Sequence, residues 1–251
     1  MRAYILNLES AQDRWAALSG AFERIGFPVT RVPGVEGAKL ELPIPEYAEG
    51  RYRWFHGRPT NVREVGCYLS HVAACRAFLE TPDEHGLICE DDLVLGPDFP
   101  KVLEAALRHR ASWNILRLTG LSTGHAVPVH ALGGGYALCV NFGRLKGAGA
   151  YVVNRAAARA FVAHLLPMWL PWDHAFDREE LRRVVEFIRA GGVEATRARD
   201  LERWAREKRR KGMSAPVSIE VPRVSADNAR FDDFRDVIYL IGRAILNLLK
   251  S

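Results

Sequence analysis

At 251 residues with 48% apolar side chains, the chain is long enough for one large α/β domain or two small ones. Its 35 basic and 30 acidic residues give a net charge of +5, an excess too small to indicate a nucleic-acid-binding protein. No run of roughly 18 apolar residues is present, so no membrane-spanning helix is predicted, and the first residues do not resemble a secretory signal.

The chain begins with a strand, a helix and a second strand. Residues 3–8 form an apolar strand, and residues 11–25 carry large apolar side chains at helical spacing. A glycine and a proline end this helix before a second strand at residues 29–32, which predicts a parallel pair with a right-handed crossover. Residues 33–60 are predicted to be a long irregular loop, whose aromatic side chains either stack on a sugar or base or pack onto the domain.

A long helix is predicted over residues 62–80. Asn61 is its expected N-cap, and Glu64 three residues later completes a capping-box pattern. Gly66 offers a place where another backbone or a ligand can approach the helix closely. His71, in the middle of the helix, is by itself compatible with a packed side chain or with a ligand-binding one.

Residues 86–95 are an apolar run interrupted by three adjacent carboxylates, Glu90, Asp91 and Asp92. The run predicts a buried strand, and ionised carboxylates at its end need a cation or hydrogen-bond donors because burying them unpaired is costly. Ligands of open α/β sheets bind outside the carboxyl ends of strands. These acids are therefore placed to hold Mg²⁺ or Mn²⁺ on a diphosphate, the alternative being a solvated turn after the strand.

The predicted elements that follow continue the α/β pattern. They are a helix at residues 99–109, a strand at 113–118, a hairpin that turns at 133–135, a strand at 149–154 and a helix at 155–166. Residues 171–180 then open a further helix. Asp173 and Asp177 share the face of its first turn, Asp173 is an alternative N-cap, and His174 with Asp177 is a weak metal-binding pair.

The C-terminal part differs in composition from the rest. Residues 197–211 carry eight Lys or Arg side chains, and residues 231–249 are nearly apolar apart from a few charges. This pattern fits either a peripheral anchor on an anionic membrane or a terminal helix docked on protein. The four cysteines form no Cys-x-x-Cys pair, which favours reduced thiols and a cytoplasmic location, with the inner face of a bacterial membrane as the place for an anchor.

Five stretches together resemble glycosyltransferase family 25, which includes lipopolysaccharide and lipooligosaccharide glycosyltransferases and the collagen galactosyltransferase domains. In chain order they are residues 4–8 with 13–14, residues 66–71, residues 87–95, residues 149–154 and residues 171–174. The resemblance implies an α/β fold of the glycosyltransferase A type, with a Rossmann-like, mostly parallel sheet flanked by helices. Residues 1–190 would form the nucleotide-sugar-binding domain and residues 191–251 a helical C-terminal extension.

The resemblance also implies an activity and a set of site residues. The expected reaction is inverting, metal-assisted transfer of a hexose, commonly galactose, from a UDP-sugar to a lipopolysaccharide or other surface-glycan acceptor, free or lipid-linked. The implied metal ligands are Glu90 and Asp92, for Mn²⁺ or Mg²⁺. The implied donor-binding residues are Asn7, Leu8, Arg14, Ser70, His71 and Asp91.

An inverting transfer needs a base that takes the proton of the acceptor hydroxyl. Asp173 is the first candidate, Asp177 the second, and His71 the third. A noncatalytic relative that binds a nucleotide sugar or a partner remains an alternative, as does a metal-dependent nucleotidyltransferase or phosphatase. The latter would be expected to carry a Gly-rich basic loop after the first strand, where this chain has residues 9–12, Glu-Ser-Ala-Gln.

Overall fold

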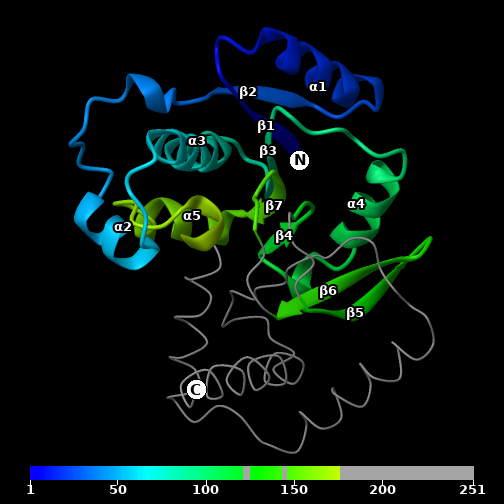
Figure 1. Ribbon diagram of the computed structural model, residues 1–251. Helices are drawn as coiled ribbons and strands as arrows, with labels where there is room; N and C mark the ends of the chain where they lie inside the picture. Colours follow the sequence, from blue (N-terminus) through cyan, green and yellow to red (C-terminus); the bar gives the residue numbers. More distant parts are fainter. Residues whose placement is uncertain (121–124, 143–145, 176–251) are drawn as a thin grey trace, which may run out of the picture.

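The computed structural model describes residues 1–120, 125–142 and 146–175 (Figure 1). A five-stranded sheet forms the centre. In spatial order its strands are β2 (Val29–Pro33), β1 (Arg2–Asn7), β3 (His85–Glu90), β7 (Ala150–Asn154) and β4 (Ile115–Arg117). β1 is parallel to both β2 and β3, whereas β7 runs antiparallel to β3 and β4. The predicted α/β class with a mostly parallel sheet is therefore confirmed.

Helices cover both faces of this sheet, as Figure 1 shows. The covering helices are α1 (Gln12–Arg24), α3 (Val62–Leu79), α4 (Phe99–Leu107) and α5 (Arg155–His164). Helix α2 (Glu49–His56) lies further out, beside α5, and short 3₁₀ turns occur at η1 (Gly37–Lys39) and η2 (Arg110–Ser112). A separate hairpin of β5 (His125–Gly133) and β6 (Tyr136–Phe142) lies beside α4, and its turn falls where the glycine triplet predicts it.

Alternating side chains divide the core into two clusters, one on each face of the sheet. Tyr4 and Leu6 of β1 pack with α3 and α5 on one face. Ala3 and Ile5, which alternate with these two residues along β1, pack with α1 and α4 on the other face. Because both faces are covered, the central strands are apolar on both sides, which is why they appear in the sequence as continuous apolar runs.

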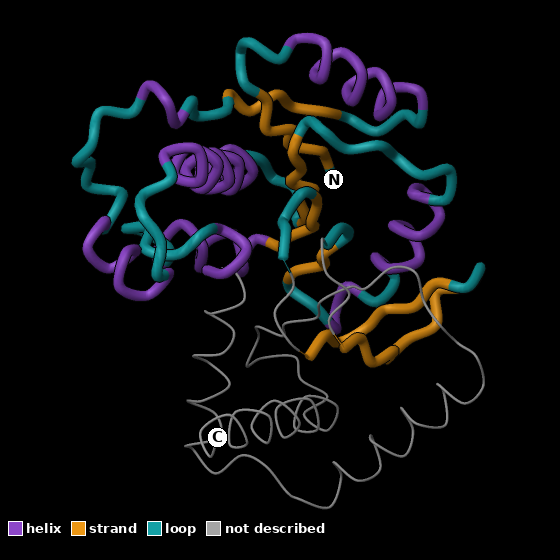
Figure 2. The backbone as a smooth tube through the Cα atoms, in the orientation of Figure 1, coloured by secondary structure: helices purple, strands orange, loops and turns teal. Residues whose placement is uncertain are grey.

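The prediction of a wholly irregular segment over residues 33–60 was wrong. Figure 2 shows helix α2 between two loops of this segment. The helix ends at Gly57, whose φ of 70° is the left-handed conformation that commonly terminates helices. Tyr47 and Tyr52 are buried in the core cluster under α3, whereas Trp54 and Phe55 of α2 are 83% and 56% exposed. The two tyrosines therefore pack the segment onto the domain. This packing stabilises α2, whose eight residues are too few to give a recognisable helical pattern in the sequence.

The predictions for residues 176–190, the basic segment 197–211 and the apolar segment 231–249 lie outside the described residues, as does the division of the chain at residue 190. Within the described ranges, no helix combines the length and the hydropathy that crossing a bilayer requires.

Candidate active site

A cavity of about 640 Å³ lies where the three parallel strands end. Its walls come from the ends of β1 and β3 (residues 6–8 and 90–92), the loop after β2 (residues 34–38), and one face of α3. In the sheet, β1 lies between β2 and β3. The chain passes from β1 to β2 on one side and then, through α3, to β3 on the other side of β1. The cavity therefore occupies the point of the sheet where the strand order reverses, the usual ligand position in such folds.

Asp91 is held by partners from the first βα unit. Its carboxylate accepts a hydrogen bond from Asn7 Nδ2 at 2.6 Å and pairs with Arg14 Nη1 at 3.1 Å. Asn7 also donates to the carbonyl of Ala11 and accepts from Arg31 Nε at 2.9 Å. Asn7 and Asp91 are 1% and 8% exposed, so this network ties the ends of β1 and β3 to the start of α1. Asp91 therefore has its charge compensated within the protein.

Removing the amide of Asn7 is expected to be destabilising. Asn7→Ala leaves the buried Asp91 carboxylate and the Arg31 guanidinium without a shared partner, which we expect to lower the free energy of unfolding by about 2–3 kcal/mol. Urea denaturation followed by circular dichroism measures the change. Arg14→Gln is the control, because Arg14 is about half exposed and its ion pair should contribute less than about 1 kcal/mol. Equal losses in both variants would contradict the assignment.

Glu90 and Asp92 line the cavity as Asp91 does, but no arginine among the described residues forms an ion pair with either of them. The side chain of Glu90 is about one-third exposed, and Asp92 is exposed. The nearby imidazole of His71 lowers the pKa of Glu90, whereas burial and the charge on Asp173 act in the opposite direction. Glu90 is therefore ionised at neutral pH, and the predicted pair of metal ligands lies together at the cavity.

His71 does not reach the cavity itself. Its ring is completely buried, stacks on the indole of Trp172 with centroids 4.9 Å apart, and places Nδ1 3.0 Å from the hydroxyl of Tyr151. Its Nε2 lies 3.5 Å from Oε1 of Glu90. Burial lowers the pKa of His71, so the imidazole is neutral at pH 7. The resemblance places His71 beside the donor pocket, and in the structure its ring lies behind Glu90, which lines the cavity.

Cys67 is a site residue that the sequence analysis did not select. It borders the cavity one helical turn before His71, and its Sγ lies within 4.8 Å of both His71 and Glu90 ligand atoms. Desolvation raises the pKa of Cys67 to about 12, and the charges of Glu90 and Asp173 add to this. A Cys and a His four residues apart on a predicted helix was the available signal, because residues at that spacing share a face.

Ser70 shapes the cavity through its backbone contacts. Its Oγ accepts a hydrogen bond from Val35 N at 2.8 Å and donates to the carbonyl of Gly66 at 2.7 Å. Gly66 packs so closely against the loop after β2 that a Cβ there would lie 2.4 Å from Val35 O. The close approach predicted for Gly66 is confirmed, with a backbone segment as the neighbour. Ser70 holds that segment, residues 34–38, as one wall of the cavity, and Leu8, which packs against Gly34, lines the cavity beside it.

Asp173 lies near this group. Its Oδ2 accepts a hydrogen bond from Gly147 N at 3.0 Å, and its charge acts on the pKa values of Glu90, His71 and Cys67. The helical residues begin at Trp172, and Pro171 supplies the first carbonyl, so the N-cap interpretation of Asp173 was wrong. Asp177, the second candidate base, lies outside the described residues.

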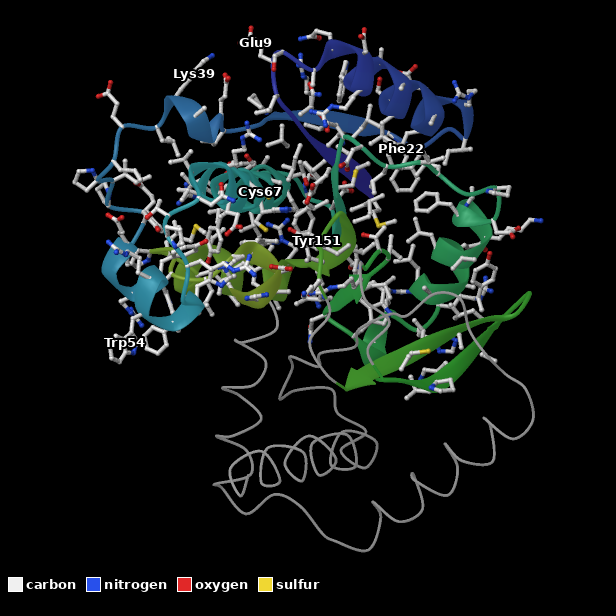
Figure 3. All side chains as sticks on the ribbon, viewed as in Figure 1. Glu9, Phe22, Lys39, Trp54, Cys67 and Tyr151 are labelled. Carbon is white, nitrogen blue, oxygen red and sulfur yellow. The ribbon has the colours of Figure 1, made fainter. Side chains whose placement is uncertain are left out.

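Acidic residues outnumber basic ones in the walls of the cavity. Four carboxylate residues, Glu36, Glu90, Asp91 and Asp92, line it together with Arg14 and Arg63. After Asp91 has paired with Arg14, the remaining negative charge favours a cation, and the arginines favour an anion beside it. Figure 3 shows Cys67 on α3 and Tyr151 on β7 near the middle of the molecule, with Trp54 at its outer edge.

Comparisons with known proteins agree with this arrangement. The family model described as "Glycosyltransferase family 25 (LPS biosynthesis protein)" matches residues 1–132, just over half of the chain. The proteins named "Glycosyltransferase 25 family member" from Aedes aegypti and Anopheles gambiae are each 27% identical over 125 residues, which cover 45% of this chain and 20% of theirs. The one from Drosophila pseudoobscura pseudoobscura is 30% identical over 102 residues, covering 38% of this chain and 16% of its own.

The chain therefore spans about a fifth of the length of the curated relatives it matches. The part covered by the family model contains β1, β3 and the acidic residues 90–92 that form the cavity. By this match, and with the cavity at the position where it is expected, the chain belongs to glycosyltransferase family 25.

Proposed function

We propose that the chain transfers a hexose, with galactose as the first candidate, from a UDP-sugar to a glycan acceptor with inversion at the anomeric carbon. The observation that carries the proposal is the cavity at the strand-order reversal, where Glu90 and Asp92 face the space that a diphosphate would occupy. Membership of a glycosyltransferase family supports the reaction class. The proposal includes a fold of the glycosyltransferase A type, for which the mostly parallel sheet and its helices are suitable.

A divalent cation fits the donor set at this position. Mg²⁺ and Mn²⁺ are commonly held by one or two carboxylates, with the other positions filled by phosphate oxygens and water. Glu90 and Asp92 are available for this role because Asp91 is occupied by Asn7 and Arg14. When bound, such a cation stabilises the charge that develops on the diphosphate leaving group.

The remaining donor residues have distinct proposed roles. Arg14 and Arg63, one from α1 and one from α3, supply positive charge for the phosphates. Leu8 and the backbone of residues 34–38 offer a surface for the nucleoside, with Ser70 fixing that backbone. Burial of these groups around the diphosphate would exclude water from the leaving group.

Asp173 is the proposed base for the acceptor hydroxyl. Asp173→Asn keeps an oxygen that can accept from Gly147 N, so we expect the fold to be retained and the rate of UDP-sugar hydrolysis to fall about 100-fold or more. Binding of UDP, measured by calorimetry, should change less than about twofold. Near-native hydrolysis in this variant would assign Asp173 a purely structural role in holding residue 147.

The decisive experiment is a panel of UDP-sugars incubated with purified protein and Mn²⁺, with release of UDP as the readout. We expect turnover of one hexose donor above the others, and its loss on chelation of the metal. Because each pocket contact contributes only a few kcal/mol, the preferred sugar is to be read from the ratio of kcat/KM values. Binding of a nucleotide sugar without turnover would favour the noncatalytic alternative.

The acceptor is proposed to be a lipopolysaccharide or another surface glycan, reached from the cytoplasmic side of a bacterial membrane. The basic segment 197–211 and the apolar segment 231–249 are the basis for a peripheral membrane contact. The family is described as comprising lipopolysaccharide biosynthesis proteins, which supports this class of acceptor.

A further inference from the structure

One group of side chains at the cavity has ligand chemistry that a Mg²⁺ or Mn²⁺ site does not use. Cys67, His71 and Glu90 each point a ligand atom to a common region, and these three atoms lie within 4.8 Å of one another. Cys67 and His71 lie one turn apart on α3, and Glu90 comes from the end of β3. A thiolate, an imidazole and a carboxylate together are the donor set of Zn²⁺ and similar transition metals.

The imidazole supplies a second, independent observation. His71 Nε2 is fully buried and has no hydrogen-bond partner of normal geometry among the described residues. Its nearest partner, Glu90 Oε1, lies at 3.5 Å, which is too long for a good hydrogen bond. In a tetrahedral zinc site, bond lengths of about 2.0–2.2 Å to nitrogen and oxygen place these two ligands about 3.4 Å apart. The pair is therefore spaced as two ligands of one ion.

The other ring nitrogen can fix the orientation that metal binding needs. Nδ1 lies 3.0 Å from the hydroxyl of Tyr151, and the ring is held flat against Trp172. When Nδ1–H donates to Tyr151, Nε2 presents its lone pair toward Glu90 and Cys67. Metal-binding histidines are commonly oriented by a hydrogen bond from their second nitrogen in this way.

We propose that Cys67, His71 and Glu90 form a thiolate-containing site for Zn²⁺ whose fourth position opens into the donor cavity. Cys67 and Glu90 both line the cavity, so a water or a phosphate oxygen completes the coordination from that side. The three ligand atoms lie within 4.8 Å of one another, and tetrahedral coordination requires a sulfur-to-nitrogen separation of about 3.6 Å, so the ligands have to draw together when the ion binds. The site shares Glu90 with the proposed Mg²⁺ or Mn²⁺ position, so the two ions compete for this carboxylate. This last consequence rests on the proposed function.

Cobalt is a direct probe of this site, because bound Co²⁺ shows a charge-transfer band in the near ultraviolet only when a thiolate coordinates it. The chain has four cysteines, and Cys75, Cys89 and Cys139 are buried in the core. Titration of the reduced, metal-free full chain with Co²⁺ should produce the band with one equivalent, and Zn²⁺ should remove it. Absence of a thiolate band in the wild-type protein would overturn the proposal.

The variants separate the three ligands from the general effect of a substitution. Cys67→Ser should abolish the band, and Glu90→Gln should weaken Co²⁺ binding at least tenfold. Cys75→Ala, which removes a thiol two turns along the same helix, should retain both band and affinity. A band that persists in Cys67→Ser would overturn the assignment. These measurements need no sugar donor, so they fail or succeed independently of the UDP-sugar assay.

Inhibition provides the link to the proposed reaction. If the protein releases UDP from a sugar donor with Mn²⁺, added Zn²⁺ should inhibit wild-type protein at concentrations at least tenfold lower than those that inhibit Cys67→Ser. The comparison is made as a ratio within each variant, so a change in basal rate does not affect it. Equal sensitivity of the two proteins, with the cobalt band present, would contradict the shared use of Glu90.

Discussion

Asp92→Asn is expected to reduce metal-dependent release of UDP from a sugar donor about 100-fold or more while leaving the fold intact. The expectation follows from position, because Asp92 faces the cavity, is exposed, and has no arginine paired with it in the described part of the chain. Losing one charge that acts on the leaving group commonly has an effect of this size. The measurement is the rate of UDP release as a function of Mn²⁺ concentration, which should show a weakened dependence on the metal.

Two controls give this result its meaning. Glu104→Gln removes an exposed carboxylate from α4, a helix that does not line the cavity, and should leave the rate unchanged. The melting temperature of Asp92→Asn should lie within about 2 °C of the wild type, since substitutions of exposed residues usually change stability by less than about 0.5 kcal/mol. A rate within threefold of the wild type would show that Asp92 is not a ligand of the catalytic metal.

A large loss of stability is expected from Gly66→Ala. A Cβ at this position would lie 2.4 Å from Val35 O and 2.7 Å from Gly37 N, both backbone atoms that cannot move aside independently. The helix and the loop after β2 must separate, which we expect to cost about 3 kcal/mol and to lower the melting temperature by roughly 6–12 °C. Thermal denaturation followed by circular dichroism measures the change.

Gly50→Ala is the matched control for the glycine substitution. Gly50 lies in α2, and nothing is within 4 Å of a Cβ built there. Because alanine favours a helix over glycine, this variant should be neutral or more stable by up to about 1 kcal/mol. The predicted cost at Gly66 would be refuted if the two variants melted at the same temperature. Gly66→Ala should also weaken UDP binding, because Val35 and its neighbours form one wall of the cavity.

Much of the fold was predictable because short sequence patterns indicate its helices, strands and turns. The helix of residues 62–79 has its N-cap at Asn61, whose side chain accepts from the backbone N–H of Arg63 as the pattern indicates. The strands β1 and β3 are apolar runs with clear ends, and the hairpin turn falls at the glycine triplet. Helix α2 was not predictable in this way, since Tyr47 and Tyr52, which stabilise it, bury their rings in a core cluster that includes residues of α5, about 100 residues further along the chain.

The acidic residues 90–92 were identified from the sequence, but the sequence did not show which of them pairs with other residues of the protein. Three adjacent carboxylates look equivalent in a linear chain. In the folded protein the carboxylate of the middle one, Asp91, is held by Asn7 and Arg14, whereas neither Glu90 nor Asp92 pairs with an arginine among the described residues. These partners come from β1 and α1, far from residue 91 in the chain, so only the fold decides which carboxylate they meet.

The sequence by itself determined the class of fold, the boundaries of its main elements and the position of the acidic cluster, because each depends on residues that are close together in the chain. Only the tertiary structure brought Cys67, His71 and Glu90 together, placed Asp173 beside them, and showed that Ser70 supports a loop. These relations join α3 to the end of β3 and to residues beyond 170, and no local pattern encodes the distance between segments that far apart. Contacts of that kind arise from packing helices onto both faces of one sheet.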